Sequence, residues 1–142
     1  MDFLKKDPVQ PISQMNPLVL AFVGDSVFDL FIRSRLAVQK NESAHKLHVK
    51  ATNYVKAAAQ SKIVAAVQDK LNEEEMAIFR RGRNAKSATI PKNADILDYR
   101  RATAFEAVIG YLYLLGRNER LLQLLSMAAE AIELEGETKN DR

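Results

Sequence analysis

The feature that most constrains the fold is a stretch of nearly continuous apolar residues, LVLAFVGDSVFDLFI, from Leu18 to Ile32. Its pattern predicts a helix that is apolar on almost every face and is therefore largely enclosed by other parts of the chain. The stretch also contains two acids, Asp25 and Asp29, and no cation. A buried, ionised carboxylate costs roughly several kcal/mol unless a cation or hydrogen bonds compensate it. Neither acid has such a partner within the stretch.

A second apolar stretch repeats this pattern further along the chain. From Ala102 to Gly116 the sequence reads ATAFEAVIGYLYLLG, and its only charged residue is Glu106. Two apolar helices that each carry an isolated acid predict a shared positive charge, and a bound metal ion would supply it. The alternative is that each acid lies at the rim of its apolar face and meets water or an arginine.

Composition places this chain among ordinary globular domains. Its 142 residues are enough for one domain with a substantial core, and 47% are hydrophobic and 27% charged. The first apolar run is interrupted by Gly24 and Asp25 and is too short to span a bilayer, and residues 1–11 do not resemble a signal peptide. The chain has no cysteine, so we expect a cytoplasmic protein without disulfides or thiolate chemistry. A net charge of +3 is compatible with an anionic partner.

Start and stop signals divide the chain into helices only. Residues 1–16, with Pro8 and Pro11, predict an irregular arm, and Asn16 before Pro17 predicts a helix start. Ser43, Asn72 and Asn118 are further start signals, the second strengthened by three glutamates. The predicted helices cover residues 17–40, a segment following Ser43, and residues 56–71, 72–82, 99–115 and 118–134. No stretch alternates like a strand, so we predict a single all-α domain over residues 17–134 and a polar tail over 135–142.

The donors near the two isolated acids favour a hard cation. Asp25 and Glu106 offer only oxygen ligands, which suit Mg²⁺, with Mn²⁺ as a substitute, rather than zinc. Gly24 precedes Asp25, and Gly110 lies one helical turn after Glu106. A glycine inside a helix costs ~1 kcal/mol relative to alanine, so each needs a reason. Close approach of the two helices would provide one and would bring the carboxylates together; a packing notch unrelated to function is the alternative.

Positive charge is concentrated just before the second apolar stretch. A predicted loop over residues 83–97 is rich in small polar residues, and loops of this length in compact domains are often functional. Residues 80–101 contain more cations than acids, the cations being Arg80, Arg81, Arg83, Lys86, Lys92, Arg100 and Arg101. These side chains could hold nucleic-acid phosphates, or they could form an ordinary solvated surface.

These motifs together resemble the ribonuclease III family. FVGDSVFDLFI at Phe22–Ile32 resembles the signature helix of that family, and TAFEAVIGYLYL at Thr103–Leu114 resembles its second acidic motif. With RRGRNAKSATIPKNADILDYRRATAFEA between Arg80 and Ala107, the chain resembles the short bacterial branch called Mini-ribonuclease III. The resemblance extends from about Asn16 to about Leu125.

The resemblance implies an all-α endonuclease domain that acts as a homodimer. The two subunits would form a valley for double-stranded RNA, and each site would cleave one strand by Mg²⁺-dependent hydrolysis. Asp25 and Glu106 match the acids that serve as catalytic residues and metal ligands. Ordinary ribonuclease III has further acids where this chain has Leu18, Ala21 and Thr103. We therefore leave open whether the site holds one metal ion or two and whether Thr103 or Asp29 assists; Thr103 is a candidate to hold a metal-bound water, and Asp29 is expected to be solvated.

The resemblance also suggests what the protein acts on. We expect no separate double-stranded-RNA-binding domain, so RNA affinity would come from the dimer valley and from Arg81, Arg83, Lys86, Lys92 and Arg100. The implied substrate is the base-paired stem that flanks precursor large-subunit (23S) ribosomal RNA. The first alternative is a non-catalytic double-stranded-RNA-binding or ribosome-associated protein on the same fold. The second is a helical interaction module, which explains the helices but not the isolated acids beside basic residues.

Overall fold

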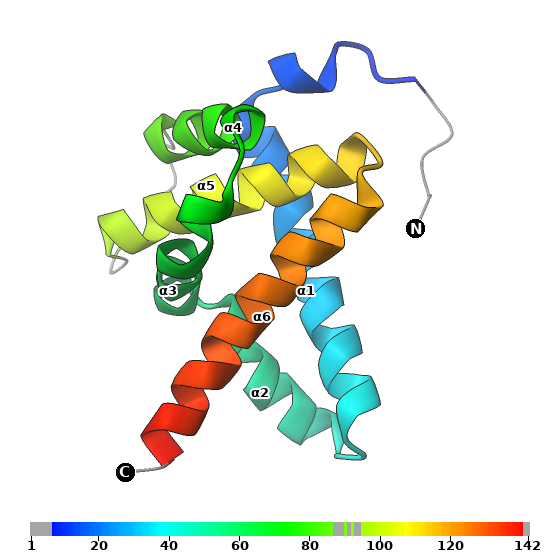
Figure 1. Ribbon diagram of the computed structural model, residues 1–142, viewed down its shortest axis with the longest axis vertical. Coiled ribbons are helices and arrows are strands. Elements are labelled where there is room, and N and C mark those ends of the chain that lie inside the picture. Colours follow the sequence, from blue (N-terminus) through cyan, green and yellow to red (C-terminus); the bar gives the residue numbers. More distant parts are fainter. Residues whose placement is uncertain (1–6, 87–89, 91, 93–94, 141–142) are drawn as a thin grey trace.

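The computed structural model describes residues 7–86, 90, 92 and 95–140, with side chains given up to residue 136. Over these residues the chain is helical, without a strand (Figure 1). The α-helices are α1 (Pro17–Gln39), α2 (Ala44–Val55), α3 (Ala57–Val67), α4 (Glu73–Asn84), α5 (Ile96–Leu114) and α6 (Asn118–Asn140), with short 3₁₀ turns at Ile12–Gln14 and Gln68–Lys70. The predicted all-α class is confirmed. In the described part of the chain, no helix has both the length and the apolar character needed to cross a membrane.

Helix α5 is the central element of the fold. It runs across the upper half of the molecule in Figure 1, and α6 starts beside its C-terminal end and runs diagonally away from it. Its most extensive packing is against α1, followed by α4 and α3, and it also contacts α6. Because other helices cover it on several sides, α5 buries a nearly continuous run from Ala102 to Leu112, interrupted only at Glu106. Enclosure of this kind explains why its sequence is apolar around the whole helix.

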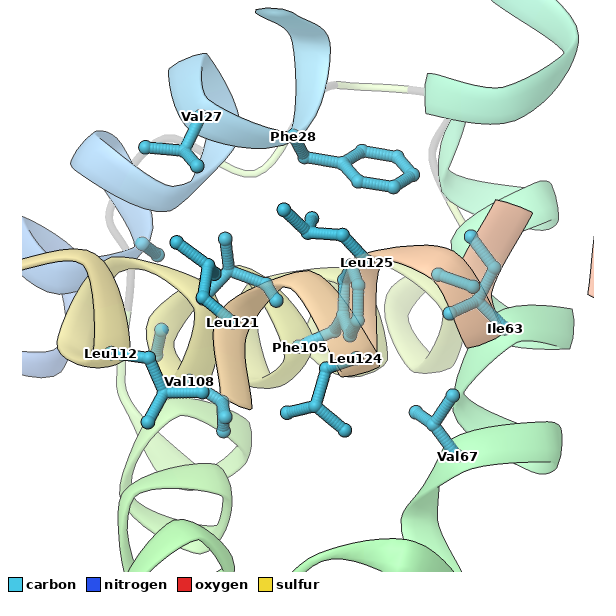
Figure 2. Packing of buried hydrophobic residues seen from close by; sticks show 14 of the residues in the cluster. Val27, Phe28, Ile63, Val67, Phe105, Val108, Leu112, Leu121, Leu124 and Leu125 are labelled. Atoms are coloured by element: carbon cyan, nitrogen blue, oxygen red, sulfur yellow. The ribbon is translucent and has the colours of Figure 1, made fainter. Parts of the chain in front are cut away.

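Besides buried side chains of α2 and α4, the core consists of a cluster that lies between α1, α3, α5 and α6. Figure 2 shows side chains from these helices meeting around α5, among them Phe28 of α1 and Phe105 of α5. Their rings pack edge to face, with centroids 5.4 Å apart and planes at 89°. Such an aromatic pair contributes about 0.5–1.5 kcal/mol beyond the burial of its apolar area. This contact helps to fix α1 on α5, and therefore the positions of the acids that the two helices carry.

Three of the predicted helix starts are confirmed by capping contacts. The side chain of Asn16 accepts a hydrogen bond from the backbone N–H of Leu18 at 2.8 Å, and Ser43 accepts one from Lys46 at 3.3 Å. Asn72 and Glu75 form a reciprocal capping box at the start of α4. These side chains satisfy backbone donors that have no partner within the helix.

Several predicted helix ends are wrong by a few residues. Helix α4 continues to Asn84 and α5 already begins at Ile96, because Asp95 caps it by accepting a hydrogen bond from Asp98 N–H at 3.0 Å. The predicted loop over 83–97 is therefore shorter, and some of its residues lie outside the described part of the chain. Helix α6 continues to Asn140, so most of the predicted polar tail is helical. Polar composition alone does not end a helix, and the glycine in this segment, Gly136, is itself helical.

Candidate active site

Helices α1 and α5 are in backbone contact at two glycines. A Cβ on Gly24 would lie 1.8 Å from the carbonyl oxygen of Glu106, and a Cβ on Gly110 would lie 1.9 Å from the carbonyl oxygen of Leu20. Neither position has room for any other amino acid unless the backbones separate. The sequence-based expectation that the glycines permit close approach is thus confirmed, and the crossing places Asp25 and Glu106 on adjoining helix surfaces.

Asp25 and Glu106 form a direct carboxylate pair. Their side chains are within hydrogen-bonding reach, Asp25 being exposed and Glu106 partly buried. The pKa of Glu106 is raised to about 9, first by burial and then by the hydrogen bond and negative charge of Asp25. Two carboxylates this close do not both ionise easily without a compensating cation, and in its absence Glu106 keeps its proton at neutral pH.

This pair fits a hard divalent cation. Both donors are carboxylate oxygens, and a cation between them would replace the shared proton and remove the repulsion between the two charges. The described residues contain no cluster of three or more His, Cys, Asp or Glu side chains. The protein would therefore supply two acidic ligands, leaving the remaining positions to water and to the phosphate oxygens of a substrate, as is usual for Mg²⁺.

Two buried polar side chains lie near this site, one on α5 and one on α3. Thr103, one turn before Glu106, is 8% exposed, and its hydroxyl donates to the Tyr99 carbonyl oxygen at 3.0 Å. Gln60 of α3 is 2% exposed, its Nε2 donates to the Val55 carbonyl oxygen at 3.2 Å, and its amide acts to lower the pKa of Glu106. Sequence analysis missed Gln60, although a lone glutamine among the alanines and apolar residues of α3 was a detectable signal.

Asp29 has a local partner just outside the apolar stretch. Its carboxylate forms a 3.0 Å ion pair with Arg33, one turn later on α1 and just beyond the apolar stretch. Both side chains are substantially exposed, 38% for Asp29 and 58% for Arg33, so the pair contributes little to stability. This arrangement agrees with the expectation that Asp29 is solvated.

Arg81 is engaged with the segment before α1. Its guanidinium donates to the backbone carbonyl oxygens of Ser13 at 2.6 Å and Met15 at 2.7 Å. On the same helix, Gly82 lies against the α5 backbone, where an added Cβ would be 2.9 Å from the Cα of Ala104. Helix α4 thus connects the N-terminal arm to α5. The RNA-binding role of Arg81 stays a prediction, and its observed contacts hold the chain entering α1.

The other predicted RNA-binding residues are distributed around the start of α5. Lys86, Lys92 and Arg100 are exposed, and Arg83 is partly buried with its Nε donating to Asn84 at 3.4 Å. Nearby, Arg101 donates to the Ser61 hydroxyl of α3 at 3.0 Å. The structure thus leaves the charged groups of the three exposed residues accessible, and their roles stay predictions.

Comparison with known proteins agrees with this geometry. The Ribonuclease III domain family matches residues 18–117, which include both glycines and both acids. This chain belongs to the ribonuclease III family. Proteins named Mini-ribonuclease 3 are similar over nearly the whole chain. The one from Clostridium tetani is 49% identical over 93% of this chain and 85% of its own length, and the one from a Thermoanaerobacter species is 48% identical over 86% of each.

A solved structure supports the fold independently. The crystal structure of a protein from Fusobacterium nucleatum is similar with a TM-score of 0.74 and 32% identity, covering 82% of this chain and 93% of that one. The sequence-based recognition of a Mini-ribonuclease III within the ribonuclease III family is therefore confirmed. Family membership supports ribonuclease activity, and the Asp25–Glu106 pair lies inside the matched region.

Proposed function

We propose that this protein is a Mg²⁺-dependent endoribonuclease that cleaves double-stranded RNA at the Asp25–Glu106 pair. The observation that carries the proposal is the contact between these two carboxylates, made possible by the glycine crossing of α1 and α5. The two carboxyl groups lie together at a partly open position, where both can be ionised at neutral pH only if a cation is bound. Membership of the ribonuclease III family supplies the reaction class.

The chemistry follows from what each carboxylate can do. When bound, Mg²⁺ would lower the pKa of water and neutralise charge on the phosphoryl oxygens. Asp25 and Glu106 would hold the cation as anionic ligands, and their position at the helix crossing would set where it lies relative to the RNA backbone. Water adds to phosphorus, the bond from phosphorus to the 3′ oxygen breaks, and that oxygen takes up a proton. The products carry a 5′-phosphate and a 3′-hydroxyl.

RNA would be held through its phosphates by Arg83, Lys86, Lys92 and Arg100, with Arg81 as a further predicted contact. Lys86, Lys92 and Arg100 are exposed near the start of α5, the helix that carries Glu106. Phosphate contacts position a duplex without reading its sequence, and they weaken with salt as counterions are released. Replacing these residues should therefore raise KM before it lowers the rate of the bound reaction.

We propose that the active form is a homodimer assembled through α1. Phe22 is 77% exposed on the turn before Asp25, and Val19 beside it is 45% exposed. Further along α1, an apolar groove of about 300 Å³ lies between α1 and α6 and is lined by residues including Leu30, Phe31 and Leu122. A two-fold interface presents the same patch twice, so Phe22 of each subunit could occupy apolar surface of the other. Such an arrangement would place two cleavage sites on one duplex.

The precursor of large-subunit ribosomal RNA is the proposed natural substrate, and the cytoplasm the proposed location. Both proposals rest on the similarity to the bacterial Mini-ribonuclease 3 proteins. The base-paired stem that flanks the mature RNA presents the regular double helix that a phosphate-binding valley would accept. Cleavage of that stem in a purified precursor, mapped to single nucleotides, tests the assignment, and an uncut precursor would contradict it.

The decisive experiment is cleavage of a long double-stranded RNA at low salt, with Mg²⁺ or with EDTA, by the wild type and by Asp25→Asn. We expect Mg²⁺-dependent cleavage that the substitution reduces by orders of magnitude while leaving RNA binding nearly intact. Asp29→Asn is the matched control, since Asp29 lies on the same helix one turn later and is paired with Arg33. RNA that is bound but never cut, even by the wild type, would favour the non-catalytic binding protein.

A further inference from the structure

Gln60 stands out among the buried polar residues of the described chain. The other two, Glu75 and Thr103, have hydrogen-bond partners for their side chains. Gln60 is 2% exposed, and its Oε1 is the one buried side-chain oxygen or nitrogen for which the described residues provide no partner. An unpaired buried acceptor costs about 1–3 kcal/mol, so the presence of an amide here needs a reason.

One contact of Gln60 is structural. Its Nε2 donates to the carbonyl oxygen of Val55 at 3.2 Å and so satisfies one of the free carbonyl groups at the end of α2. This role alone does not explain a buried amide. The end of α2 is near the surface, where the exposed Lys56 follows and water can reach neighbouring carbonyls. A solvent-exposed donor would satisfy Val55 without burying an unpaired Oε1.

The amide of Gln60 also lies near Glu106, close enough to act on its carboxyl group. An amide has two N–H donors, so Gln60 can serve the Val55 carbonyl and the Glu106 carboxylate together. The amide is also neutral. A lysine or arginine in its place would orient Glu106 equally well but would compete with a cation for the negative charge. A neutral donor leaves that charge available, which is the property required of a group that supports a metal ligand.

We propose that Gln60 is a positioning residue of the cation site, whose amide N–H holds the Glu106 carboxylate in place beside Asp25 so that both acids bind one divalent cation. This inference rests on the proposed function, because it requires the carboxylate pair to be a metal site. Gln60 does not touch the substrate. Its effect on cleavage passes through Glu106.

The test is the affinity of the RNA-free protein for Mn²⁺, measured by titration calorimetry on the wild type, Gln60→Leu and Gln60→Met. Both substitutions introduce an apolar side chain of similar size and remove the amide. Ser43→Ala is the matched control, because Ser43 caps the opposite end of α2 and contacts neither acid. Thermal unfolding of each variant, followed by circular dichroism, measures the structural effect separately.

Removing an outer group that supports a metal ligand typically weakens metal binding about 10- to 100-fold, and we expect both Gln60 variants to fall in this range. Ser43→Ala should lower the melting temperature and leave the Mn²⁺ affinity unchanged. The Mg²⁺ concentration needed for half-maximal cleavage should rise in the Gln60 variants, with activity restored at high Mg²⁺. If either folded Gln60 variant binds Mn²⁺ as the wild type does, Gln60 is only a helix cap and the inference is wrong. A wild type that neither binds Mn²⁺ nor cleaves RNA would instead contradict the proposed function.

Discussion

Replacing Gly24 by alanine should disrupt the fold and the active site together. The added Cβ would lie 1.8 Å from the Glu106 carbonyl oxygen, whereas ordinary contact begins at 3.4 Å, so α1 and α5 would separate by about 1.6 Å. The obstructing atoms are backbone atoms of α5 and cannot rotate away. Overpacking of a core typically costs about 1–3 kcal/mol, and a clash with backbone belongs at the upper end of that range.

The same substitution has an opposing effect that must be subtracted. Alanine favours a helix by about 1 kcal/mol relative to glycine. The net loss of unfolding free energy for Gly24→Ala is therefore expected to be about 2 kcal/mol, or more if the core cannot relax. The cleavage rate should fall by more than the loss of folded protein alone would cause, because a shift of about 1 Å in a catalytic group can lower the rate about 100-fold.

The assay is urea unfolding at one fixed protein concentration, followed by circular dichroism, with cleavage rates measured in parallel. Gly136→Ala is the matched control, because Gly136 is helical and an added Cβ there meets no atom within 4 Å. That variant should be about 0.5–1 kcal/mol more stable than the wild type, with unchanged activity. The reasoning is refuted if Gly24→Ala is as stable as the wild type or gains stability as Gly136→Ala does.

Three further predictions concern charge and assembly. Burial alone would raise the pKa of Glu75, but hydrogen bonds from Arg120 and from the Asn72 backbone lower it overall. The contribution of ionised Glu75 to the free energy of unfolding should therefore be present above about pH 4.3 and be lost as the pH falls through the folded-state pKa. Glu75→Gln should destabilise the protein in urea at pH 7 by about 1–3 kcal/mol, with a smaller difference at pH 3; equal differences at both pH values would contradict this. Lys86→Ala should reduce the slope of log RNA affinity against log salt by about one, measured by fluorescence anisotropy, and an unchanged slope would exclude a phosphate contact. If the protein forms the proposed dimer through α1, Phe22→Lys should convert it to folded monomer in sedimentation velocity. The same change at the exposed Val38 should not, and a dimer that survives Phe22→Lys would place the interface elsewhere.

Local signals in the sequence were sufficient to predict where most of the helices start. Asn16, Ser43 and Asn72 cap the helices that they were predicted to start, because a short polar side chain satisfies nearby backbone donors regardless of the rest of the fold. Gly116 ends α5 with a φ of 72°, and the Arg117 N–H bonds back to the Leu112 carbonyl at 3.0 Å. The end of α6 was placed too early, since a polar segment lacks an equally local stop signal.

Long-range contacts were not accessible in the same way. Arg81 looked like one more cation of a basic segment, yet its guanidinium holds backbone carbonyls of residues that lie far from it in sequence. Asp29 looked isolated only because Arg33 lies just past the apolar stretch. Gln60 was overlooked because its significance depends on its proximity to Glu106 of another helix.

The sequence by itself determined the helical class, the caps, the two isolated acids and the two glycines. It determined them because periodicity, capping chemistry and the cost of burying a charge act within a few residues. Only the tertiary structure decided that Gly24 and Gly110 meet each other, that Asp25 and Glu106 form one pair, and that the buried Gln60 lies near that pair. These facts depend on the angle and depth at which α1, α3 and α5 cross, and packing of side chains from the whole core sets that geometry.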